Sequence, residues 1–532
     1  MLGDDIHLWG DLCGALARRH GAKTAFVDVD DACLGFDAFE LRVNRLNHAL
    51  ARRGCVKGDR VAVLAKNCTR YVETYGVAKT GLVVVPLNWR LAPEELARLL
   101  AHCEPVVIVA DAQHAPVIDT LRGSLAHARL FVVMGPGRDG WVAYEDLMAE
   151  GSEDEPRPSA PLSPEDPICL TYTSGTTGMP KGVALSHRGI LGNARVSAQR
   201  VMRLTPGDRA LAAMPFFHAG GMWYYLHASY AAGCTSVILP GFDPETVLER
   251  ISRQAVTNVH LVPTMIDALL ASPSLAQADL RSLRLIFYAA SSIPVVLLKK
   301  AMAAFGHCGF LQSYGATETG LLTMLDEADH HAALQDGKAH LLASCGRALA
   351  GNELFIADEQ GRPQPGAMDG EIVARGRYMM LGYWNNPEAN RAAMRDGGFH
   401  TGDMGHVDEA GYLYVVDRKQ DMIVTGGENV YPSEVEDVLY RHPAIAQAAV
   451  FGIPDPVWVE KVVAAVVLKP GLAATDAALI EHVRRHLAAY KCPKRIFIEC
   501  QLPVSAVGKI VKKTLKQKFS VQEQETRHAS SR

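Results

Sequence analysis

The feature that most constrains the fold is a regular alternation of helical patterns and short apolar runs. Residues 37–54 carry apolar side chains at helical spacing and are followed by an apolar run at 59–65, and the same pairing recurs at 92–103 and 105–111. The runs are rich in β-branched residues and apolar on both faces, as in parallel strands covered by helices on each side. The sequence therefore predicts an α/β fold of stacked sheets and helices up to about residue 340.

Chain length and composition indicate a folded protein with more than one domain. At 532 residues the chain is too long for a single core, so its size predicts two to four domains. Hydrophobic residues make up 48% and charged residues 21% of the chain. The net charge of −4 gives no basis for a general nucleic-acid surface, so we expect no nucleic-acid partner.

The sequence also bears on location and redox state. The start, "MLGDDIHLWGDL", carries early acidic residues and no long apolar run, which argues against a signal peptide. No apolar stretch approaches the roughly 20 residues of a membrane span. The 11 cysteines form no CxxC pair, which favours reduced thiols over a metal cluster. We therefore expect a cytoplasmic protein without a transmembrane segment.

The pattern changes near residues 412–432, where β-rich turns give way to a new helix and strand. Ser433 is placed to N-cap that helix, with Glu436 three residues further on. The acidic, proline-rich stretch 151–167 leads directly into the next motif, so we interpret it as a loop within one domain. We predict an N-terminal domain at 1–417, a hinge at 418–421 and a small α+β C-terminal domain at 422–532.

One segment, "TYTSGTTGMPKG" at 171–182, has far more hydroxyl groups and glycines than a turn requires. Glycines let backbone N–H groups approach an anion closely, hydroxyls add hydrogen-bond donors, and Lys181 adds a positive charge. The glycine and lysine spacing differs from the Walker pattern. We interpret the segment as a phosphate-binding loop that follows a buried strand.

The same segment resembles the signature of the adenylate-forming superfamily, which includes acyl-CoA synthetases, adenylation domains and firefly luciferase. Six further blocks are similar to family motifs and occur in the family's order: "MPFFHAGG" (214–221), "YGATET" (314–319), "TGD" (401–403), "DRKQDMI" (417–423), "GGENVYPSEVE" (426–436) and "VGKIVK" (507–512). The resemblance covers nearly the whole chain and is closest to fatty-acid or aryl-acid CoA ligases. It implies a large N-terminal domain and a small mobile C-terminal domain.

The resemblance also implies a site for ATP and Mg²⁺. Glu318 is similar to the family carboxylate that binds Mg²⁺, with Thr173 as a second ligand, and a phosphate-bound Mg²⁺ takes few protein ligands. Thr317 should contact the α-phosphate. The residues that would hold the triphosphate are Thr173, Ser174, Gly175, Thr176, Thr177, Gly178 and Lys181.

The resemblance further implies residues that recognise the nucleoside. The stretch "YAASSIP" (288–294) stands where the family has its adenine-binding strand, so Ala290 and Ser291 should flank the purine. Gln312 and Tyr314 should complete that wall. For the ribose, Asp403 should accept hydrogen bonds from both hydroxyls, and Arg418 should also bind the ribose.

Two residues are expected to act on the carboxylic acid. Lys509 resembles the lysine that reaches the α-phosphate and the carboxylate during adenylation, and His218 resembles the gate beside the acyl pocket. The residues around His218 would make an apolar acid pocket, namely Phe217, Trp223, Tyr224 and Leu226.

The thiol acceptor is implied by the C-terminal segment. The stretch around Trp458 is similar to the CoA-ligase pattern, so Trp458 should line the pantetheine path beside Gly426 and Gly427. Val459 stands where the family usually has glycine, and Gln420 stands where its hinge commonly has Asp or Lys. Basic residues that could meet the CoA phosphates are Lys491, Lys494 and Arg495.

The sequence thus predicts an ATP-dependent carboxylic acid:CoA ligase that uses ATP, Mg²⁺ and coenzyme A, with a homodimer as an open possibility. One alternative is an adenylation enzyme that loads a carrier protein. Another is an inactive nucleotide- or acyl-binding protein on the same fold. The joint presence of five residues argues against inactivity: Lys181, Glu318, Asp403, Arg418 and Lys509.

Overall fold

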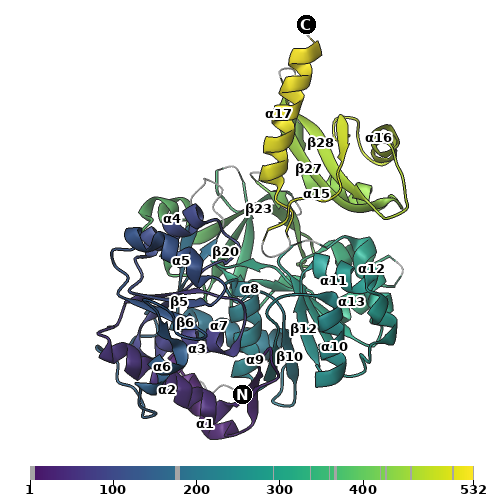
Figure 1. The fold of residues 1–532 in the computed structure, drawn as a ribbon. Helices are drawn as coiled ribbons and strands as arrows, with labels where there is room; N and C mark the ends of the chain where they lie inside the picture. The colour runs from purple at the N-terminus through teal and green to yellow at the C-terminus, as the bar shows by residue number, and fades with distance from the viewer. Residues whose placement is uncertain are drawn as a thin grey trace.

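A computed structural model shows a large body with a smaller C-terminal unit above it (Figure 1). The structure describes residues 6–173, 180–291, 293–335, 337–358, 360–364, 368–419, 421–425, 428–455, 458–505 and 509–530, with the backbone alone at 429 and 523–530.

The first large sheet has seven strands in the order β14-β13-β12-β10-β11-β1-β2. All neighbouring pairs are parallel except β1 with β2. The helices α10 (Pro244–Gln254), α11 (Pro263–Ala271) and α12 (Val295–Ala304) cover one face with a shared apolar layer. The strands are β1 (Thr24–Val27), β2 (Cys33–Gly35), β10 (Arg209–Ala212), β11 (Thr235–Ile238), β12 (Asn258–Leu261), β13 (Leu285–Ala289) and β14 (Gly309–Ser313).

The second large sheet has eight strands in the order β21-β9-β8-β4-β3-β5-β6-β7. It is parallel from β8 to β7, and β9 and β21 extend it antiparallel. The strands are β3 (Arg60–Leu64), β4 (Val83–Pro86), β5 (Val107–Asp111), β6 (Leu130–Met134), β7 (Val142–Ala143), β8 (Pro167–Thr173), β9 (Lys181–Ser186) and β21 (Gly382–Tyr383).

Helices cover both faces of this second sheet, as the apolar strand pattern predicted. On one face lie α4 (Pro93–Cys103) and α5 (Ala115–Leu121). On the other face, α2 (Phe36–Arg52) and α3 (Thr69–Tyr75) share one apolar core with α1 (Trp9–His20), α7 (His187–Val196) and the first sheet. The predicted α/β architecture is therefore confirmed, and the two sheets meet across a common core.

A third, antiparallel sheet links the body to the C-terminal unit. It consists of β19 (Asn352–Ala357), β20 (Gly370–Gly376), β22 (Met394–Arg395), β23 (Gly398–Val407) and β24 (Leu413–Arg418). Strand β23 lies at the top of the body, beneath the C-terminal unit (Figure 1).

The C-terminal unit is a five-stranded sheet between two apolar layers. The helices α15 (Pro432–Tyr440) and α16 (Asp476–Arg484) pack on one face, and α17 (Lys512–Ser530) packs on the other. The strands are β25 (Ile423–Thr425), β26 (Glu428–Val430), β27 (Ile445–Asp455), β28 (Val459–Leu468) and β29 (Arg495–Ile498).

The predicted N-cap of the first C-terminal helix is wrong. Helix α15 begins at Pro432, and Tyr431 occupies the N-cap position without a side-chain hydrogen bond. The Ser433 hydroxyl instead donates to the Val416 carbonyl of β24. Glu436 accepts from the Val450 N–H at 2.7 Å and pairs with Lys512 at 2.9 Å. Both side chains of the expected capping box therefore bond to other elements and do not cap the helix.

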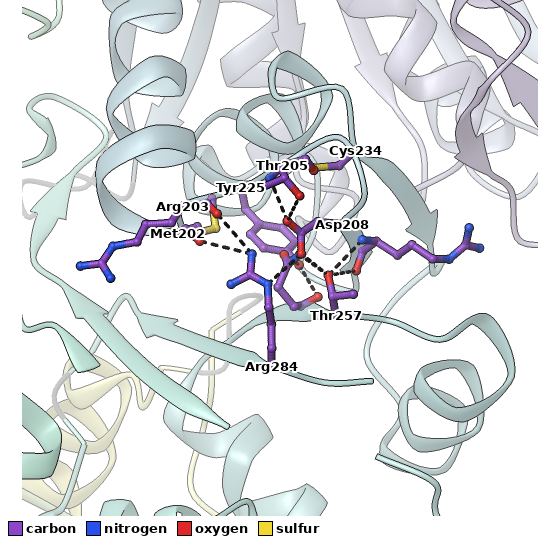
Figure 2. Close-up of polar contacts among 10 residues, drawn as sticks. Met202, Arg203, Thr205, Asp208, Tyr225, Cys234, Thr257 and Arg284 are labelled. Carbon is purple, nitrogen blue, oxygen red and sulfur yellow. Dashed lines mark hydrogen bonds and ion pairs between the residues drawn. The ribbon is translucent and has the colours of Figure 1, made fainter. Parts of the chain in front are cut away.

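A polar cluster fastens the amino edge of the first sheet (Figure 2). Asp208, which precedes β10, accepts hydrogen bonds from Arg284 Nε and Thr257 Oγ1, both at 2.8 Å. Its second oxygen accepts from the Thr205 N–H at 2.8 Å. Because these residues precede β10, β12 and β13, the cluster aligns three parallel strands at the end opposite to the predicted site.

Three further features of the sequence can be compared with the structure. Residues 151–166 form no helix or strand, and this stretch packs on the large body, where Lys79 binds Glu155 at 2.8 Å. All 11 cysteines are free. None of the helices in the part of the chain that the structure describes is long and apolar enough to cross a membrane.

Candidate active site

The predicted phosphate loop connects two paired strands. Strand β8 ends at Thr173 and β9 begins at Lys181, and these two residues are direct partners across the antiparallel pair. The pairing holds the Thr173 hydroxyl and the Lys181 ammonium at the two ends of the loop. Five predicted triphosphate ligands lie outside the described residues: Ser174, Gly175, Thr176, Thr177 and Gly178.

Glu318 lies against both ends of this loop. Thr173 Oγ1 is 3.5 Å from Glu318 Oε1, and the Tyr383 hydroxyl donates to the same oxygen at 3.1 Å. Lys181 Nζ lies 4.8 Å from the centre of the Tyr383 ring. Burial raises the pKa of Glu318, and the hydrogen bonds from Tyr383 and Thr173 and the charge of Lys181 oppose this shift. The structure thus brings together the three residues that were assigned to phosphate and metal.

This group of donors fits a magnesium ion bound to phosphate. A half-buried carboxylate beside a threonine hydroxyl offers hard oxygen ligands. Mg²⁺ on a nucleotide usually takes only one or two ligands from the protein. A cation there would also offset the cost of burying the Glu318 charge. Within the described ranges no cluster of three or more His, Cys, Asp or Glu side chains is placed to hold a metal ion.

Tyr383 was missed by the sequence analysis. It lies on β21, which pairs with β9 far away in sequence. The N–H of Met380 in the same segment donates to the Glu318 carbonyl at 2.8 Å. The sequence signal was the "GYWN" turn at 382–385, but only the strand pairing shows that its tyrosine reaches the carboxylate.

The predicted ribose site forms on the third sheet. Asp403 and Arg418 are direct partners across β23 and β24, and Arg418 Nε lies 3.6 Å from Asp403 Oδ1. The Tyr314 hydroxyl donates to Asp403 Oδ2 at 2.6 Å. Burial raises the pKa of Asp403, against the opposing effects of Tyr314, Arg418 and Lys509. A carboxylate held between a phenol and a guanidinium suits the recognition of a diol.

The predicted adenine wall follows the ends of two neighbouring strands. Ala290 follows β13, and Gln312 lies on the adjacent β14. Ala290 has φ +76°, a left-handed conformation that is uncommon outside glycine. Such conformations persist where surrounding structure enforces them and are frequent at ligand sites. The Gln312 side-chain oxygen is buried and has no hydrogen-bond partner among the described residues.

Thr317 is fixed by a tyrosine from the central core. The Tyr224 hydroxyl donates to the carbonyls of Ala316 and Thr317, at 3.2 Å in each case. Tyr224 therefore holds the turn that carries Thr317 and Glu318. Of the other predicted pocket residues, Trp223 is packed edge-on against Tyr75 with ring centres 4.7 Å apart, and Phe217 and Leu226 are buried.

Lys509 and His218 lie at the interface between the body and the C-terminal unit. Burial and then the charge of Arg418 lower the pKa of Lys509 to about 8, while Asp403 opposes the change. Burial and then Lys509 lower the pKa of His218 to about 4. The C-terminal unit thus places Lys509 near Asp403 and His218 of the large body and near Arg418 at the predicted hinge, three residues that were assigned to nucleotide and acid.

The predicted CoA residues lie on another part of the C-terminal unit. Trp458 and Val459 are 47% and 68% exposed where β28 begins, and Lys494 Nζ is 5.8 Å from the Trp458 ring centre. Val459 has φ +71°. Lys491 is paired with Glu434 at 2.7 Å, so its charge is already partly neutralised. Gly426 and Gly427 lie outside the described residues.

Comparisons with known proteins show which family the chain belongs to. The AMP-binding enzyme family matches residues 15–384, and the AMP-binding enzyme C-terminal domain matches residues 434–509. An indoleacetate–CoA ligase of Aromatoleum aromaticum is 37% identical over 89% of this chain and 91% of its own length. A feruloyl-CoA synthase of an Amycolatopsis species is 37% identical over 95% and 96%.

A solved structure has the same fold as this chain. The anthranilate CoA ligase AuaEII in complex with anthranoyl-AMP has a TM-score of 0.89 and 28% identity, over 98% of this chain and 100% of that chain. Both parts of the chain thus match, in sequence and in fold. The protein belongs to the AMP-binding enzyme family, the adenylate-forming superfamily that its motifs resemble.

Proposed function

We propose that the protein is an ATP-dependent carboxylic acid:CoA ligase that acts on a fatty or aryl acid. Two observations carry the proposal: Glu318 lies against both ends of the phosphate loop, and Asp403 lies between Tyr314 and Arg418, with Lys509 near enough to act on its charge. These groups meet the needs of an adenylate-forming reaction: a metal carboxylate, a ribose acceptor and a cation for developing charge.

In the first half-reaction, a carboxylate oxygen of the acid attacks the α-phosphorus of ATP. The bond to the β-phosphate oxygen breaks, and acyl-AMP and pyrophosphate form. Asp403 binds the ribose and Lys181 the phosphates, while Lys509 stabilises negative charge on the α-phosphate and on the acid. Glu318 and Thr173 would hold Mg²⁺, which supplies charge neutralisation on the triphosphate when bound.

In the second half-reaction, the CoA sulfur attacks the acyl carbon of acyl-AMP. The bond from that carbon to the phosphate oxygen breaks, and the thioester and AMP leave. We assign the approach of CoA to Trp458 with Gly426 and Gly427, and the closing of the acid pocket to His218. The exposed Trp458 beside the basic Lys494 supports an approach from the C-terminal unit.

The domain limits belong to the same proposal, with the body at 1–417, a hinge at 418–421 and a mobile unit at 422–532. Separate apolar layers in the C-terminal sheet support its independence. A cytoplasmic location and a possible homodimer also remain proposals, which cell fractionation and light scattering test.

Hydroxamate trapping of adenylates over fatty and aryl acids, followed by addition of CoA, tests the function. We expect pyrophosphate release with some of these acids and conversion of the adenylate to a CoA thioester. Adenylate transfer to a carrier protein but not to CoA would favour the alternative acceptor. Absence of adenylate with every acid, in folded protein that binds ATP, would contradict the proposal.

A further inference from the structure

One buried histidine near the site has no use in the reaction described so far. His260 lies on β12, in the middle of the first sheet, and is only 2% exposed. Its ring stacks on Phe287 of β13 with centres 4.7 Å apart and planes 21° apart, and Tyr225 lies 5.5 Å away. His260 is therefore held in an aromatic setting on the face of the sheet that turns toward the shared core.

Both ring nitrogens of His260 lack a hydrogen-bond partner among the described residues. The nearby Tyr225 hydroxyl is directed elsewhere, since it donates toward the Asn258 carbonyl and side-chain oxygens, both at 2.8 Å. The Gly220 backbone lies close enough to interact weakly with the ring and to raise its pKa, although neither ring nitrogen makes a hydrogen bond of normal geometry with the described residues. Leaving buried polar atoms unpaired is costly, and such atoms in a native protein call for a ligand or water.

His260 lies next to the residue assigned to the acid gate. A Cβ atom added to Gly220 would be 3.2 Å from His218 Nδ1 and 3.5 Å from His260 Cε1, so this glycine separates the two rings. His218 in turn interacts with Lys509. The order Lys509, His218, His260 thus leads from the group assigned to the acid's carboxylate into the interior.

We propose that His260 binds a polar substituent of the carboxylic acid, and that the acid is an aryl acid with a hydroxyl or ring N–H. This inference rests on the proposed function, because it takes the Lys509 and His218 side as the entry for the acid. Phe287 and Tyr225 offer flat aromatic surfaces beside the ring. An unsubstituted fatty acid would leave both nitrogens of His260 unpaired.

The protonation state of His260 fits this role. Burial, then the neighbouring His218, lower the pKa of His260 to about 3, so the ring is neutral at pH 7. A neutral imidazole offers one N–H donor and one acceptor nitrogen. It can therefore accept from a phenol or an indole N–H, or donate to a phenol oxygen. A site built to pair with such a group rejects the analogue that lacks it, since its own polar atoms then stay unpaired.

The test compares kcat/KM for adenylation of two matched acid pairs by wild type and His260→Leu. The pairs are 3-(4-hydroxyphenyl)propionate with 3-phenylpropionate, and indole-3-acetate with 1-naphthylacetate. We expect wild type to prefer the polar member of at least one pair by about 10- to 100-fold. In His260→Leu the preference should fall below about 3-fold, through loss of the polar acid and gain of the apolar one.

His227→Phe is the matched control, because His227 is also fully buried with an unpaired nitrogen but packs against Trp9 and Trp223. It should keep the wild-type preference. Equal kcat/KM within both pairs in wild type, or an unchanged preference in folded His260→Leu that binds ATP, would overturn the inference. Either result would leave the ligase function intact. Activity on fatty acids with none of the four aryl acids would also overturn the inference and leave the function, whereas only failure of every fatty and aryl acid to form an adenylate would remove the function itself.

Discussion

At the scale of single residues, the central feature is a lysine whose charge depends on its surroundings. Lys509 is half-buried near Arg418, and its desolvation and this like charge lower its pKa to about 8. The ammonium form is the one that can stabilise charge on the α-phosphate. Lys509 is therefore mostly charged at pH 7 and mostly neutral at pH 9.

This predicts an alkaline limit for adenylation. The value of kcat/KM for pyrophosphate release should fall above about pH 8, because that parameter reports groups in the free enzyme. Arg418→Gln removes the like charge, so the fall should move to higher pH even though the plateau is lower. A pH profile between 6 and 10 measures both. An alkaline limb that stays in place in Arg418→Gln would contradict this assignment.

A second residue-scale prediction concerns the orientation of the metal carboxylate. Tyr383→Phe removes the donor 3.1 Å from Glu318 Oε1. Loss of a group that orients a metal ligand typically weakens metal binding by about 10- to 100-fold. We expect about 10-fold lower adenylation at limiting Mg²⁺ and recovery at high Mg²⁺. Tyr414→Phe, which loses a hydroxyl bonded to Asp408 at 3.4 Å, should show neither effect, and equal Mg²⁺ dependence of the two variants would rule out the role.

At the scale of secondary-structure elements, the turn between β27 and β28 holds a strained residue. Val459 has φ +71°, and the left-handed region costs a non-glycine residue about 1–2 kcal/mol. The sequence showed that valine replaces a customary glycine, and the structure shows why glycine suits the position.

Val459→Gly should therefore stabilise the protein. The relief of strain exceeds the entropic cost of glycine, about 0.5–1 kcal/mol, so we expect a net gain of about 0.5–1 kcal/mol. Calorimetric unfolding should show a raised midpoint for Val459→Gly and a smaller rise for Val459→Ala, which keeps its Cβ. A lower midpoint for Val459→Gly would show that contacts of the valine side chain outweigh the strain.

The polar cluster at the amino edge of the first sheet makes a prediction about stability and pH. Although burial opposes its charge, hydrogen bonds from Arg284, Thr205 and Thr257 hold the pKa of Asp208 below its usual value. A lowered folded-state pKa gives stability that is present above the unfolded pKa, near 4, and is lost as pH falls through the folded pKa.

Asp208→Asn should thus destabilise the protein by about 1–3 kcal/mol at pH 7. The difference from wild type should shrink below about pH 4. Urea unfolding at several pH values measures it. A difference that grows as the pH falls would contradict the account.

Elements also show what the sequence could and could not predict. Helix α4 was expected from the apolar spacing over residues 92–103, because such spacing is a local signal, and Pro93 suits the first helical position it occupies. The capping role of Ser433 was wrong, because a β24 carbonyl outside the helix binds the hydroxyl. Tyr383 and His260 were missed for the same reason: their roles depend on strand pairings across long sequence distances, which no local pattern contains.

At the scale of the whole molecule, the C-terminal unit carries residues assigned to both half-reactions. Lys509 lies near Asp403 and His218 of the large body. Trp458 is exposed where β28 begins. This arrangement suits the first half-reaction, and the second requires Lys509 to move away so that a thiol can reach the acyl carbon.

The central claim is that Lys509 serves only the first half-reaction, and single-turnover kinetics of each half-reaction in Lys509→Ala test it most directly. Acyl-AMP formation should fall by about 100-fold or more, as for loss of a charged transition-state contact. Conversion of supplied acyl-AMP and CoA to thioester should stay near the wild-type rate. Gln420→Pro, at the predicted hinge outside the described residues, should show the reverse pattern, since a proline ring restricts rotation. Equal loss of both half-reactions in folded Lys509→Ala protein would contradict the account.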